Sequence, residues 1–290
     1  MEINARTKLC VLLGNPVEHS VSPQIHNSAF RTLGLNYVYL AFSVLDLEGA
    51  VRGIRAFGIR GASITIPYKE KIIPYLDQLD ELAEKIGAVN TVVNEEGKLL
   101  GYNTDGEAVY QALKDYGINL EASRVIILGA GGASRAIAFT LASKSPKSRL
   151  LIFNRTFSRA QALAEEIKEK TRAEIQALAW EEEPLKKELS RAQLLINATS
   201  VGMYPEIEQS PIPAQWLHPR LWVFDIVYNP LETQLLKQAK KIGAKTIAGL
   251  EMLVRQAGEQ FRLWTGKAPP LEVMFSAGKQ ALEQGFKNQA

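Results

Sequence analysis

A short glycine-rich segment is the clearest candidate for binding chemistry in this chain. The apolar run Arg124–Leu128 leads directly into it, and a helical pattern follows it through Ser143. Glycine is needed where a backbone turns sharply and where it must approach a pyrophosphate without an intervening Cβ. The N–H groups and the positive dipole end of the following helix also favour phosphate. The segment therefore predicts a dinucleotide site, formed by Gly129, Ala130, Gly131, Gly132, Ala133 and Ser134.

Ser134 is a departure from the G-x-G-x-x-G pattern, because it replaces the third glycine. Serine is small, and Gly132 supplies a further glycine, so we expect the loop to keep its geometry. An ordinary turn between a strand and a helix is the alternative interpretation.

The end of the next predicted strand indicates which dinucleotide is bound. NAD enzymes place Asp or Glu there, about 20 residues past the glycines, to accept from the ribose 2′-OH. Here no carboxylate follows Leu150–Phe153. The residues that follow it include Asn154, Arg155, Thr156, Ser158 and Arg159. Guanidinium and hydroxyl donors suit a 2′-phosphate. The pattern favours NADP, against the alternative that the arginines merely begin a solvated helix.

A third candidate element follows the strand predicted over Leu194–Asn197. Short polar residues at the carboxyl end of a strand face the cofactor crevice in this type of sheet. We therefore assign Thr199 and Ser200 to the cofactor site, with a polar turn at Gly202 as the alternative.

Strand-like apolar runs alternate with amphipathic helical patterns along the chain, which is typical of an α/β fold. In the first part, strands are predicted at Leu9–Leu13, Tyr37–Phe42, Ala62–Ile66, Val89–Val93 and Lys98–Tyr102. In the second part, they are predicted at Arg124–Leu128, Leu150–Phe153, Glu174–Leu178, Leu194–Asn197, Leu221–Ile226 and Lys245–Ala248. Helical patterns begin at Ser22 and Asp46 and cover Asp105–Tyr116, Ser158–Lys170, Leu231–Ile242, Leu250–Thr265 and Leu271–Glu283.

This order of elements predicts two α/β domains. Residues 105–248 are expected to form a Rossmann-type, doubly wound parallel sheet that binds NADP. Residues 1–104 and 249–290 are expected to form a substrate-binding domain. The last two helices are too many for the parallel sheet, so we expect them to return to the first domain, with a cleft between the two domains.

The composition argues against several classes of protein. The 290 residues have a net charge of +3 and no dense basic run, so no nucleic-acid partner is expected. Cys10, the single cysteine, lies in an apolar run and is expected to be buried. One cysteine and three histidines in the whole sequence argue against a structural zinc site. No stretch approaches the roughly 18–20 apolar residues of a membrane span, so we expect a cytoplasmic protein.

Several further blocks closely resemble the shikimate dehydrogenase family. They are residues 14–27 (Gly-Asn-Pro-Val-Glu-His-Ser-Val-Ser-Pro-Gln-Ile-His-Asn), Ile64–Lys69, Gly87–Thr91, Asn103–Gly106 and Gly249–Leu253. The glycine loop and the segments 154–156 and 197–203 fit the same family, in the same order along the chain. The resemblance covers nearly the whole chain. It implies reversible, NADPH-dependent reduction of 3-dehydroshikimate to shikimate, in aromatic amino acid biosynthesis.

The resemblance also implies roles for individual residues. It makes Lys69 and Asp105 the catalytic pair. The substrate-binding residues it implies are Ser20, Ser22 and Tyr228 at the carboxylate, and Thr65, Asn90, Asp105 and Gln256 at the ring hydroxyls. It adds Ile226 and Gly249 to the cofactor-binding residues. Ser63 stands where the family often has Asn, and this shorter side chain is expected to weaken a contact to a ring hydroxyl.

These residue types suit a polyhydroxylated ring acid, because Asn, Thr, Ser and Gln supply short donors and acceptors. Hydride transfer from a secondary alcohol also moves a proton, which a side chain must handle when no zinc ion acts as Lewis acid. Lys69 can donate that proton to the developing alkoxide and remove it in the reverse direction. The sequence leaves open which of Lys69 and Asp105 carries it.

Purely structural interpretations exist for the same residues. Ser22 before Pro23 is a good helix N-cap. Thr104 or Asp105 could cap the following helix, and Lys69 could be a solvated charge. Their joint occurrence at the family's spacing favours the functional interpretation. His19 and His26 are expected to be structural hydrogen-bonding residues.

Two other functions stay open at this point. A quinate/shikimate dehydrogenase would share the fold and often use NAD, which the Asn154–Thr156 segment disfavours. A non-catalytic dinucleotide-sensing module would lack the Lys–Asp pair, which is present. The oligomeric state is also open, with a homodimer as one alternative.

Overall fold

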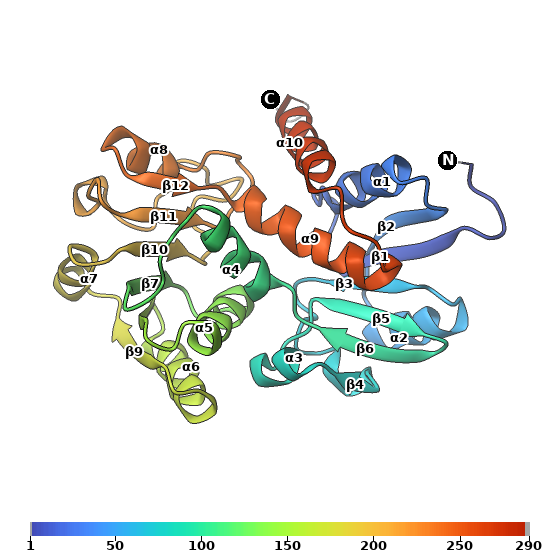
Figure 1. The fold of residues 1–290 in the computed structure, drawn as a ribbon, viewed down its shortest axis with the longest axis horizontal. Helices are drawn as coiled ribbons and strands as arrows, with labels where there is room; N and C mark the ends of the chain where they lie inside the picture. Colours follow the sequence, from blue (N-terminus) through green and yellow to red (C-terminus); the bar gives the residue numbers. More distant parts are fainter. Residues whose placement is uncertain (1, 288–290) are drawn as a thin grey trace. The chain divides into compact units, whose positions relative to one another are not determined.

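The computed structural model describes residues 2–287, which form two compact α/β units (Figure 1). The first unit contains the residues up to Asp105 and those from Val254 onward, and the second is Gly106–Leu253. Within the described residues, no helix is both long enough and apolar enough to cross a membrane.

The first unit is built on a mixed six-stranded sheet of order β2-β1-β3-β5-β6-β4. Its strands are β1 (Lys8–Gly14), β2 (Tyr37–Ser43), β3 (Gly61–Ile64), β4 (Gln78–Leu79), β5 (Thr91–Glu95) and β6 (Lys98–Tyr102). β1 runs parallel to β2 and β3, whereas β5 is antiparallel to both β3 and β6. The carboxyl end of β3 and the start of β5 therefore meet at one edge.

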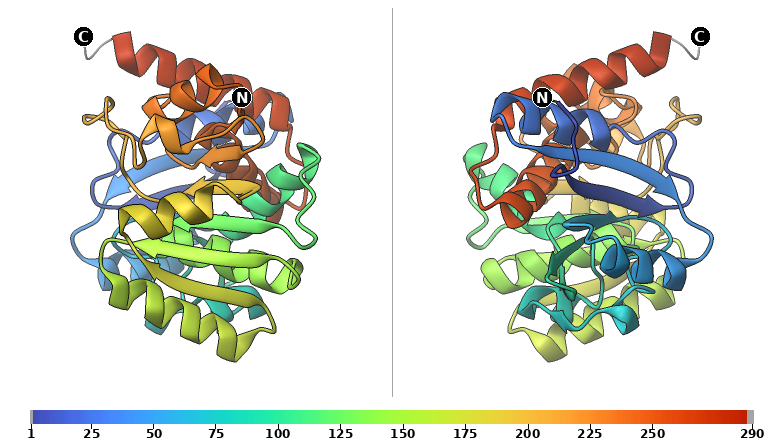
Figure 2. Two further views of the ribbon diagram at one scale, coloured as in Figure 1. Left: turned by 90° about the vertical axis from the view of Figure 1, so that its left-hand side faces the viewer. Right: turned by 90° about the vertical axis from the view of Figure 1, so that its right-hand side faces the viewer.

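The helices of this unit include the last two helices that the structure describes. They are α1 (Ser22–Thr32), α2 (Leu47–Ala56), α3 (Glu81–Ile86), most of α9 (Gly249–Thr265) and α10 (Leu271–Lys287). α10 packs against α1 (Figure 2). Trp264 of α9 donates a hydrogen bond to the carbonyl of Val92 in β5 (3.0 Å). The predicted return of the C-terminal helices to the first domain is confirmed.

An aromatic cluster fills the core between α1, β2 and α9. The His26 ring stacks on Tyr39, with 4.4 Å between centroids, and lies 5.1 Å from the Trp264 ring. Burial lowers the pKa of His26 to about 3, so the ring is neutral. Neither ring nitrogen has a hydrogen-bond partner of ordinary geometry among the residues that the structure describes. A hydrogen bond from the Gln260 side chain acts against this burial effect on the His26 pKa, so the structural hydrogen-bonding role of His26 stays a prediction beside its packing role. His19 is exposed.

The second unit contains an all-parallel six-stranded sheet of order β12-β11-β10-β7-β8-β9. Its strands are β7 (Arg124–Leu128), β8 (Arg149–Asn154), β9 (Glu174–Ala179), β10 (Leu194–Asn197), β11 (Trp222–Asp225) and β12 (Lys245–Ile247). Its helices are α4 (Asp105–Asp115) without its first residue, α5 (Gly132–Lys144), α6 (Phe157–Lys170), α7 (Glu182–Leu189) and α8 (Gln234–Lys241). α5 and α7 lie on opposite faces (Figure 1). This strand order is that of the Rossmann fold, as predicted.

Burial explains why the strands of this sheet were readable from sequence. Residues 125–128 of β7 and 150–153 of β8 are fully buried, as expected for parallel strands covered on both faces. Leu185 and Leu189 of α7 pack with Leu235 of α8 in one core cluster under the sheet. Cys10 in β1 is also fully buried, as predicted.

Several predicted boundaries are wrong for local reasons. β3 ends at Ile64 rather than Ile66, since Ile66 is exposed and precedes a proline, which has no N–H for a ladder. β5 begins at Thr91, because the Val89 N–H bonds the Lys69 carbonyl instead of a strand (2.7 Å). α8 begins at Gln234 rather than Leu231, after the Thr233 cap.

The N-terminus of α1 also differs from the structural interpretation of Ser22 as a cap. The N-cap residue is Val21, without a side-chain capping bond, and Ser22 is the first residue of the helix. The Ser22 side chain is therefore available for another contact. It accepts a hydrogen bond from the Ser20 hydroxyl (3.1 Å).

Gly106, at the start of α4, gives a test of helix packing in the second unit. A Cβ at this position would lie 2.0 Å from Thr140 Oγ1 and 2.4 Å from the Ala136 carbonyl oxygen of α5. We expect Gly106→Ala to lower the free energy of unfolding by about 1–3 kcal/mol through overpacking. Urea unfolding measures this difference.

Gly53→Ala in α2 is the matched control, because the nearest atoms to its added Cβ would be 3.8 Å away. It should raise the free energy of unfolding by about 0.5–1 kcal/mol, since alanine has the higher helix propensity. Equal stability of the two variants would contradict the close contact between α4 and α5.

Candidate active site

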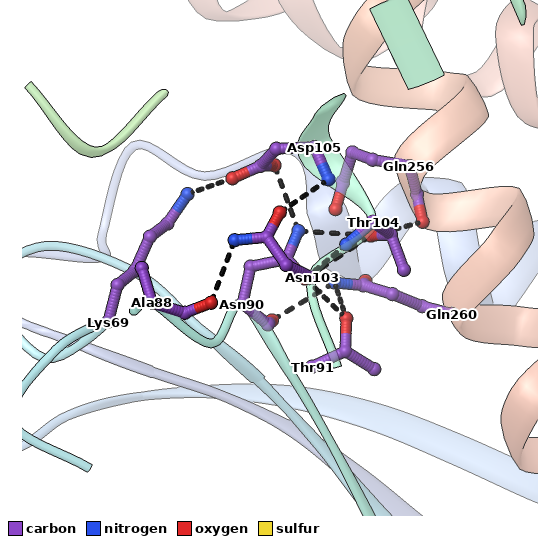
Figure 3. Close-up of polar contacts among 9 residues, drawn as sticks. All are labelled: Lys69, Ala88, Asn90, Thr91, Asn103, Thr104, Asp105, Gln256 and Gln260. Atoms are coloured by element: carbon purple, nitrogen blue, oxygen red, sulfur yellow. Dashed lines mark hydrogen bonds and ion pairs between the residues drawn. The ribbon is translucent and has the colours of Figure 1, made fainter. Parts of the chain in front are cut away.

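Lys69 and Asp105 meet in the first unit although 36 positions separate them in the chain. Lys69 lies in the turn after β3, and Asp105 is the first residue of α4. The Lys69 Nζ donates a hydrogen bond to Asp105 Oδ2 at 2.5 Å (Figure 3). The lysine side chain is 21% exposed and the aspartate side chain 6%. The pair therefore combines a buried carboxylate with an ammonium group that a substrate can reach.

Asn90 fixes the other oxygen of this carboxylate. Its Nδ2 donates to Asp105 Oδ1 (2.8 Å) and to Thr104 Oγ1 (3.0 Å), while its Oδ1 accepts from the Thr104 N–H (2.9 Å). Asn103 adds a backbone anchor, because its Oδ1 accepts from the Asp105 N–H (3.1 Å). Thr104 and Asp105 thus serve this cluster through their side chains, and Asn103 makes the local bond at the start of α4.

The remaining predicted residues of the first unit lie near the ends of its strands and helices. The Thr104 hydroxyl donates to the carbonyl of Gln256 in α9 (3.2 Å), which joins Gln256 to the Asp105 cluster. Thr65 directly follows β3, and its N–H bonds the Leu13 carbonyl of β1 (3.0 Å). Ser20 and Ser22 form the separate hydroxyl pair described above.

The glycine loop of the second unit leaves room for a phosphate group. Gly129 has φ +105°, and a Cβ there would lie 2.9 Å from the Ala198 carbonyl oxygen. Added Cβ atoms at Gly131 and Gly132 would meet nothing within 4 Å. The α5 N-terminus has no side-chain cap, so its first N–H groups can bind an anion. These features fit a dinucleotide pyrophosphate.

Ser134, the departure from the glycine pattern, stabilises the loop itself. It is fully buried, and its hydroxyl donates to the Gly129 carbonyl at 2.6 Å. The replacement of a glycine by this small side chain therefore adds a bond across the loop. The expected loop geometry is compatible with serine here.

The predicted 2′-phosphate segment follows β8, the neighbour of β7 in the sheet. The Asn154 amide donates to the Thr156 carbonyl (2.8 Å), which shapes the turn. Arg155, Thr156 and Arg159 are exposed. Their cationic and hydroxyl groups are thus accessible to an anionic ligand, as 2′-phosphate recognition requires.

The other predicted cofactor residues lie after β10 and β11. Thr199 donates its hydroxyl to Asn197 Oδ1 (2.7 Å), and Ser200 is exposed. The Ile226 N–H bonds the Asn197 carbonyl (3.1 Å). A Cβ on Gly249 would lie 2.4 Å from the Val227 carbonyl oxygen, so its backbone touches this segment. Burial raises the pKa of Tyr228 above its ordinary value, so its hydroxyl is protonated at neutral pH, as that of an ordinary tyrosine is.

Asp225 connects two segments that carry predicted site residues, and the sequence analysis did not single it out. It is fully buried at the end of β11, and it accepts from Thr233 Oγ1 (2.7 Å), Asn197 Nδ2 (2.9 Å) and the Val227 N–H (3.1 Å). These bonds join the polar turn after β10 to the segment that carries Tyr228. A polar residue ending a buried strand was the available signal, as it was for Asn197.

Burial also raises the pKa of Asp225 from 3.8 to about 6, even though its three hydrogen bonds favour the ionised form. The folded state therefore holds this proton more tightly than the unfolded state, and ionisation destabilises the fold as pH rises from about 4 to about 6. We expect the free energy of unfolding of the wild type, relative to Asp225→Asn, to fall by about 2–3 kcal/mol over this window.

Unfolding in urea at pH values from about 4 to about 8 measures this difference, which should become constant above about pH 7. Taking the difference between the two proteins removes the contribution of groups that they share. A difference that does not vary with pH would contradict a raised Asp225 pKa.

Comparison with known proteins gives matches along the whole chain. Three family models match: the shikimate dehydrogenase substrate binding domain at residues 12–92, shikimate / quinate 5-dehydrogenase at 111–227, and the shikimate 5′-dehydrogenase C-terminal domain at 249–274. The shikimate dehydrogenase (NADP+) of Moorella thermoacetica is 45% identical over 97% of this chain and 96% of its own length.

Solved structures are equally similar. A shikimate dehydrogenase in complex with NADP+ has a TM-score of 0.90 at 45% identity, covering 97% of this chain and 98% of its own. The enzyme of Thermus thermophilus, in complex with NADP(H) and shikimate, has a TM-score of 0.85 at 40% identity, covering 95% of this chain and 100% of its own.

The sheet order, the glycine loop and these matches define an NADP-dependent oxidoreductase. The likeness extends over nearly the full length of the relatives. The chain belongs to the shikimate dehydrogenase family. Its reaction is that of the family, the reduction of 3-dehydroshikimate to shikimate with NADPH, in aromatic amino acid biosynthesis.

Proposed function

We propose that Lys69 and Asp105 carry out the proton transfer of this reaction. The observation that supports this most directly is the 2.5 Å contact between Lys69 Nζ and Asp105 Oδ2, with Asn90 bonded to the second carboxylate oxygen. One N–H of the ammonium group is directed to Asp105. The other two can face the substrate oxygen.

When bound, NADPH supplies the hydride that forms the new C–H bond. The carbonyl π electrons then move to oxygen, and the Lys69 ammonium donates the proton that completes the hydroxyl group. The partly exposed lysine regains its proton from solvent. In the oxidation direction, the neutral amine removes the hydroxyl proton as hydride leaves the carbon. Asp105 holds the amine in place and accepts a bond from an adjacent ring hydroxyl.

The substrate-binding residues follow from the same proposal. Ser20 and Ser22, whose hydroxyls are already bonded to each other, would turn their donors to the substrate carboxylate. Tyr228 is proposed for the same carboxylate, because it matches the family's tyrosine at that place and its protonated phenol can donate a hydrogen bond. Thr65, Asn90 and Gln256 are proposed for the ring hydroxyls, beside Asp105. Such a site rejects substrates that lack those hydroxyls, because its buried polar groups would stay unpaired.

Replacement of Lys69 tests the catalytic assignment. We expect Lys69→Ala to lower kcat for shikimate oxidation by about 10²–10⁴, the range typical for loss of a general acid or base. NADPH affinity should change little, because Lys69 lies outside the glycine loop and the arginine segment. Absorbance at the nicotinamide band measures turnover, and fluorescence titration measures NADPH binding.

Lys85→Ala is the matched control, since Lys85 forms an exposed ion pair with Glu81 on α3. Its turnover should equal that of the wild type, because an exposed pair of this kind contributes little. Near-normal turnover of Lys69→Ala would remove Lys69 from the mechanism.

For the cofactor, we propose that Arg155, Thr156 and Arg159 bind the 2′-phosphate of NADP. We expect Arg155→Ala and Arg159→Ala each to raise the KM for NADP by about tenfold to a hundredfold, the effect of losing a charge-assisted hydrogen bond. The KM for NAD should stay the same, because NAD has no 2′-phosphate.

Arg172→Ala, which removes an arginine after α6, controls for general loss of positive charge. It should leave both KM values unchanged. Equal effects of Arg155→Ala on NADP and NAD would assign Arg155 another role.

Substrate range, assembly and location complete the proposal. We propose shikimate rather than quinate as the substrate, and parallel oxidation rates of the two acids with NADP and NAD distinguish them. A cytoplasmic location is proposed because the buried, unpaired Cys10 and the use of NADPH suit a reducing compartment. A homodimer stays a prediction. Sedimentation, which measures the mass of the particle in solution, distinguishes it from a monomer.

A further inference from the structure

Gln260 connects helix α9 to the residues that hold Asp105. It lies one helical turn after Gln256, and its side chain is buried, with 2% exposure of the residue. Its Nε2 donates to Thr91 Oγ1 (3.0 Å) and to the Asn90 carbonyl (3.2 Å), and its Oε1 accepts from the Ser63 hydroxyl (2.8 Å). Figure 3 shows the two bonds of Nε2, and with the Ser63 bond both ends of the amide are used by the protein.

The direction of the bonds toward the catalytic pair follows from one backbone group. The Thr104 N–H can only donate, so the Asn90 atom facing it is Oδ1, and Nδ2 faces Asp105. Thr91 Oγ1 lies 2.7 Å from that same Oδ1, so the Thr91 hydroxyl must donate to it. Its single proton is then used, and it accepts from Gln260 Nε2.

These bonds form a line of hydrogen bonds that runs from Tyr39 through Ser63, Gln260, Thr91 and Asn90 to Asp105. The donors at its Tyr39 end are assigned in the same way. Ser63 uses its one proton on Gln260 Oε1, so it accepts from the Tyr39 hydroxyl, which lies 2.7 Å away. Burial raises the pKa of Tyr39, so this phenol stays a donor. Ser63 is also the position at which the sequence departs from the family pattern. Here its hydroxyl contacts Gln260.

The members of this line are almost fully buried: Tyr39, Ser63, Asn90, Thr91 and Gln260 have at most 5% exposure. Hydrogen bonds in series polarise one another in a medium of low dielectric constant. Each donor in this line points toward the Asp105 carboxylate, so the orientation of each amide and hydroxyl supports the next. Loss of one member leaves its neighbours with unsatisfied buried groups and new freedom to rotate.

We propose that Gln260 is a positioning residue for this enzyme, acting through Thr91 and Asn90 to orient the Asp105 carboxylate toward Lys69 and the substrate. This inference rests on the proposed roles of Lys69 and Asp105. It predicts that the line contributes to turnover and to shikimate binding, and contributes nothing to NADP binding.

A double-mutant cycle between Gln260 and Thr91 tests this. Gln260→Met keeps the side-chain length, and Thr91→Val keeps the shape without the hydroxyl. We expect each variant to lower kcat about threefold to tenfold and to raise the KM for shikimate, with the KM for NADP unchanged. Because both changes break the same line, the double variant should lose little more than the worse single variant.

Trp264→Phe is the matched control. It removes another buried hydrogen bond from the same helix to the same strand, from Trp264 Nε1 to the Val92 carbonyl, which does not lead to Asp105. It should lower Tm while leaving kcat and the KM for shikimate within about twofold of the wild type. Its effect on kcat, combined with Gln260→Met, should be the product of the separate effects.

Two results would overturn the proposal. One is a Gln260→Met enzyme with a lowered Tm but unchanged kcat and KM for shikimate. This result would show that Gln260 has a purely structural role. The other is a double variant whose losses multiply. If Gln260→Met does not fold, the same cycle is measured with Ser63→Ala and Thr91→Val. Near-normal turnover of Lys69→Ala would instead contradict the proposed role of Lys69, on which this inference rests, so the two failures are distinguishable.

Discussion

The site in the first unit is arranged around one buried carboxylate, that of Asp105, which its partners hold in a fixed orientation. A carboxylate removed from water is strongly unfavourable unless charged and hydrogen-bonding partners replace the solvent. Asp105 has Lys69 at one oxygen and Asn90 at the other. Lys69 lies in the turn after β3, and Asn90 lies in the loop before β5. Because β3 pairs parallel with β1 and antiparallel with β5, the end of β3 and the start of β5 lie together, next to the first residue of α4.

In the second unit, the charge is on the phosphate groups of the ligand, and the protein binds them with backbone N–H groups. A phosphate group needs N–H donors in a loop without side chains, which Gly129–Gly132 and the uncapped end of α5 provide. In the proposed function, the first unit therefore carries the proton transfer and the second unit binds the phosphate groups.

Much of this could be predicted from sequence where local pattern and tertiary environment agree. β6, β7 and β10 have the predicted bounds, because their apolar runs are framed by turn residues. β4, α3 and α7 were not predicted, since such short elements carry too little periodicity to stand out. Ser22 shows the converse: a good capping sequence is a local preference, and the packing of α1 placed the cap at Val21.

The site shows a similar limit at the level of side chains. Lys69, Asn90 and Asp105 lie in motifs that identify them, whereas Gln260 has no motif of its own, and neither Thr91 nor Tyr39 suggests chemistry by its type. Hydrogen bonds between strands and a helix link these three residues to Asp105, and each N–H or O–H donor in the series has one acceptor. The bonded residues can be far apart in the chain, as Ser63 and Gln260 are, at 197 positions from each other. Sequence spacing does place Gln256 and Gln260 on one face of α9, since residues four apart are neighbours on a helix. It cannot show which buried partner each amide finds, because that depends on the register of β3 and β5 beneath the helix.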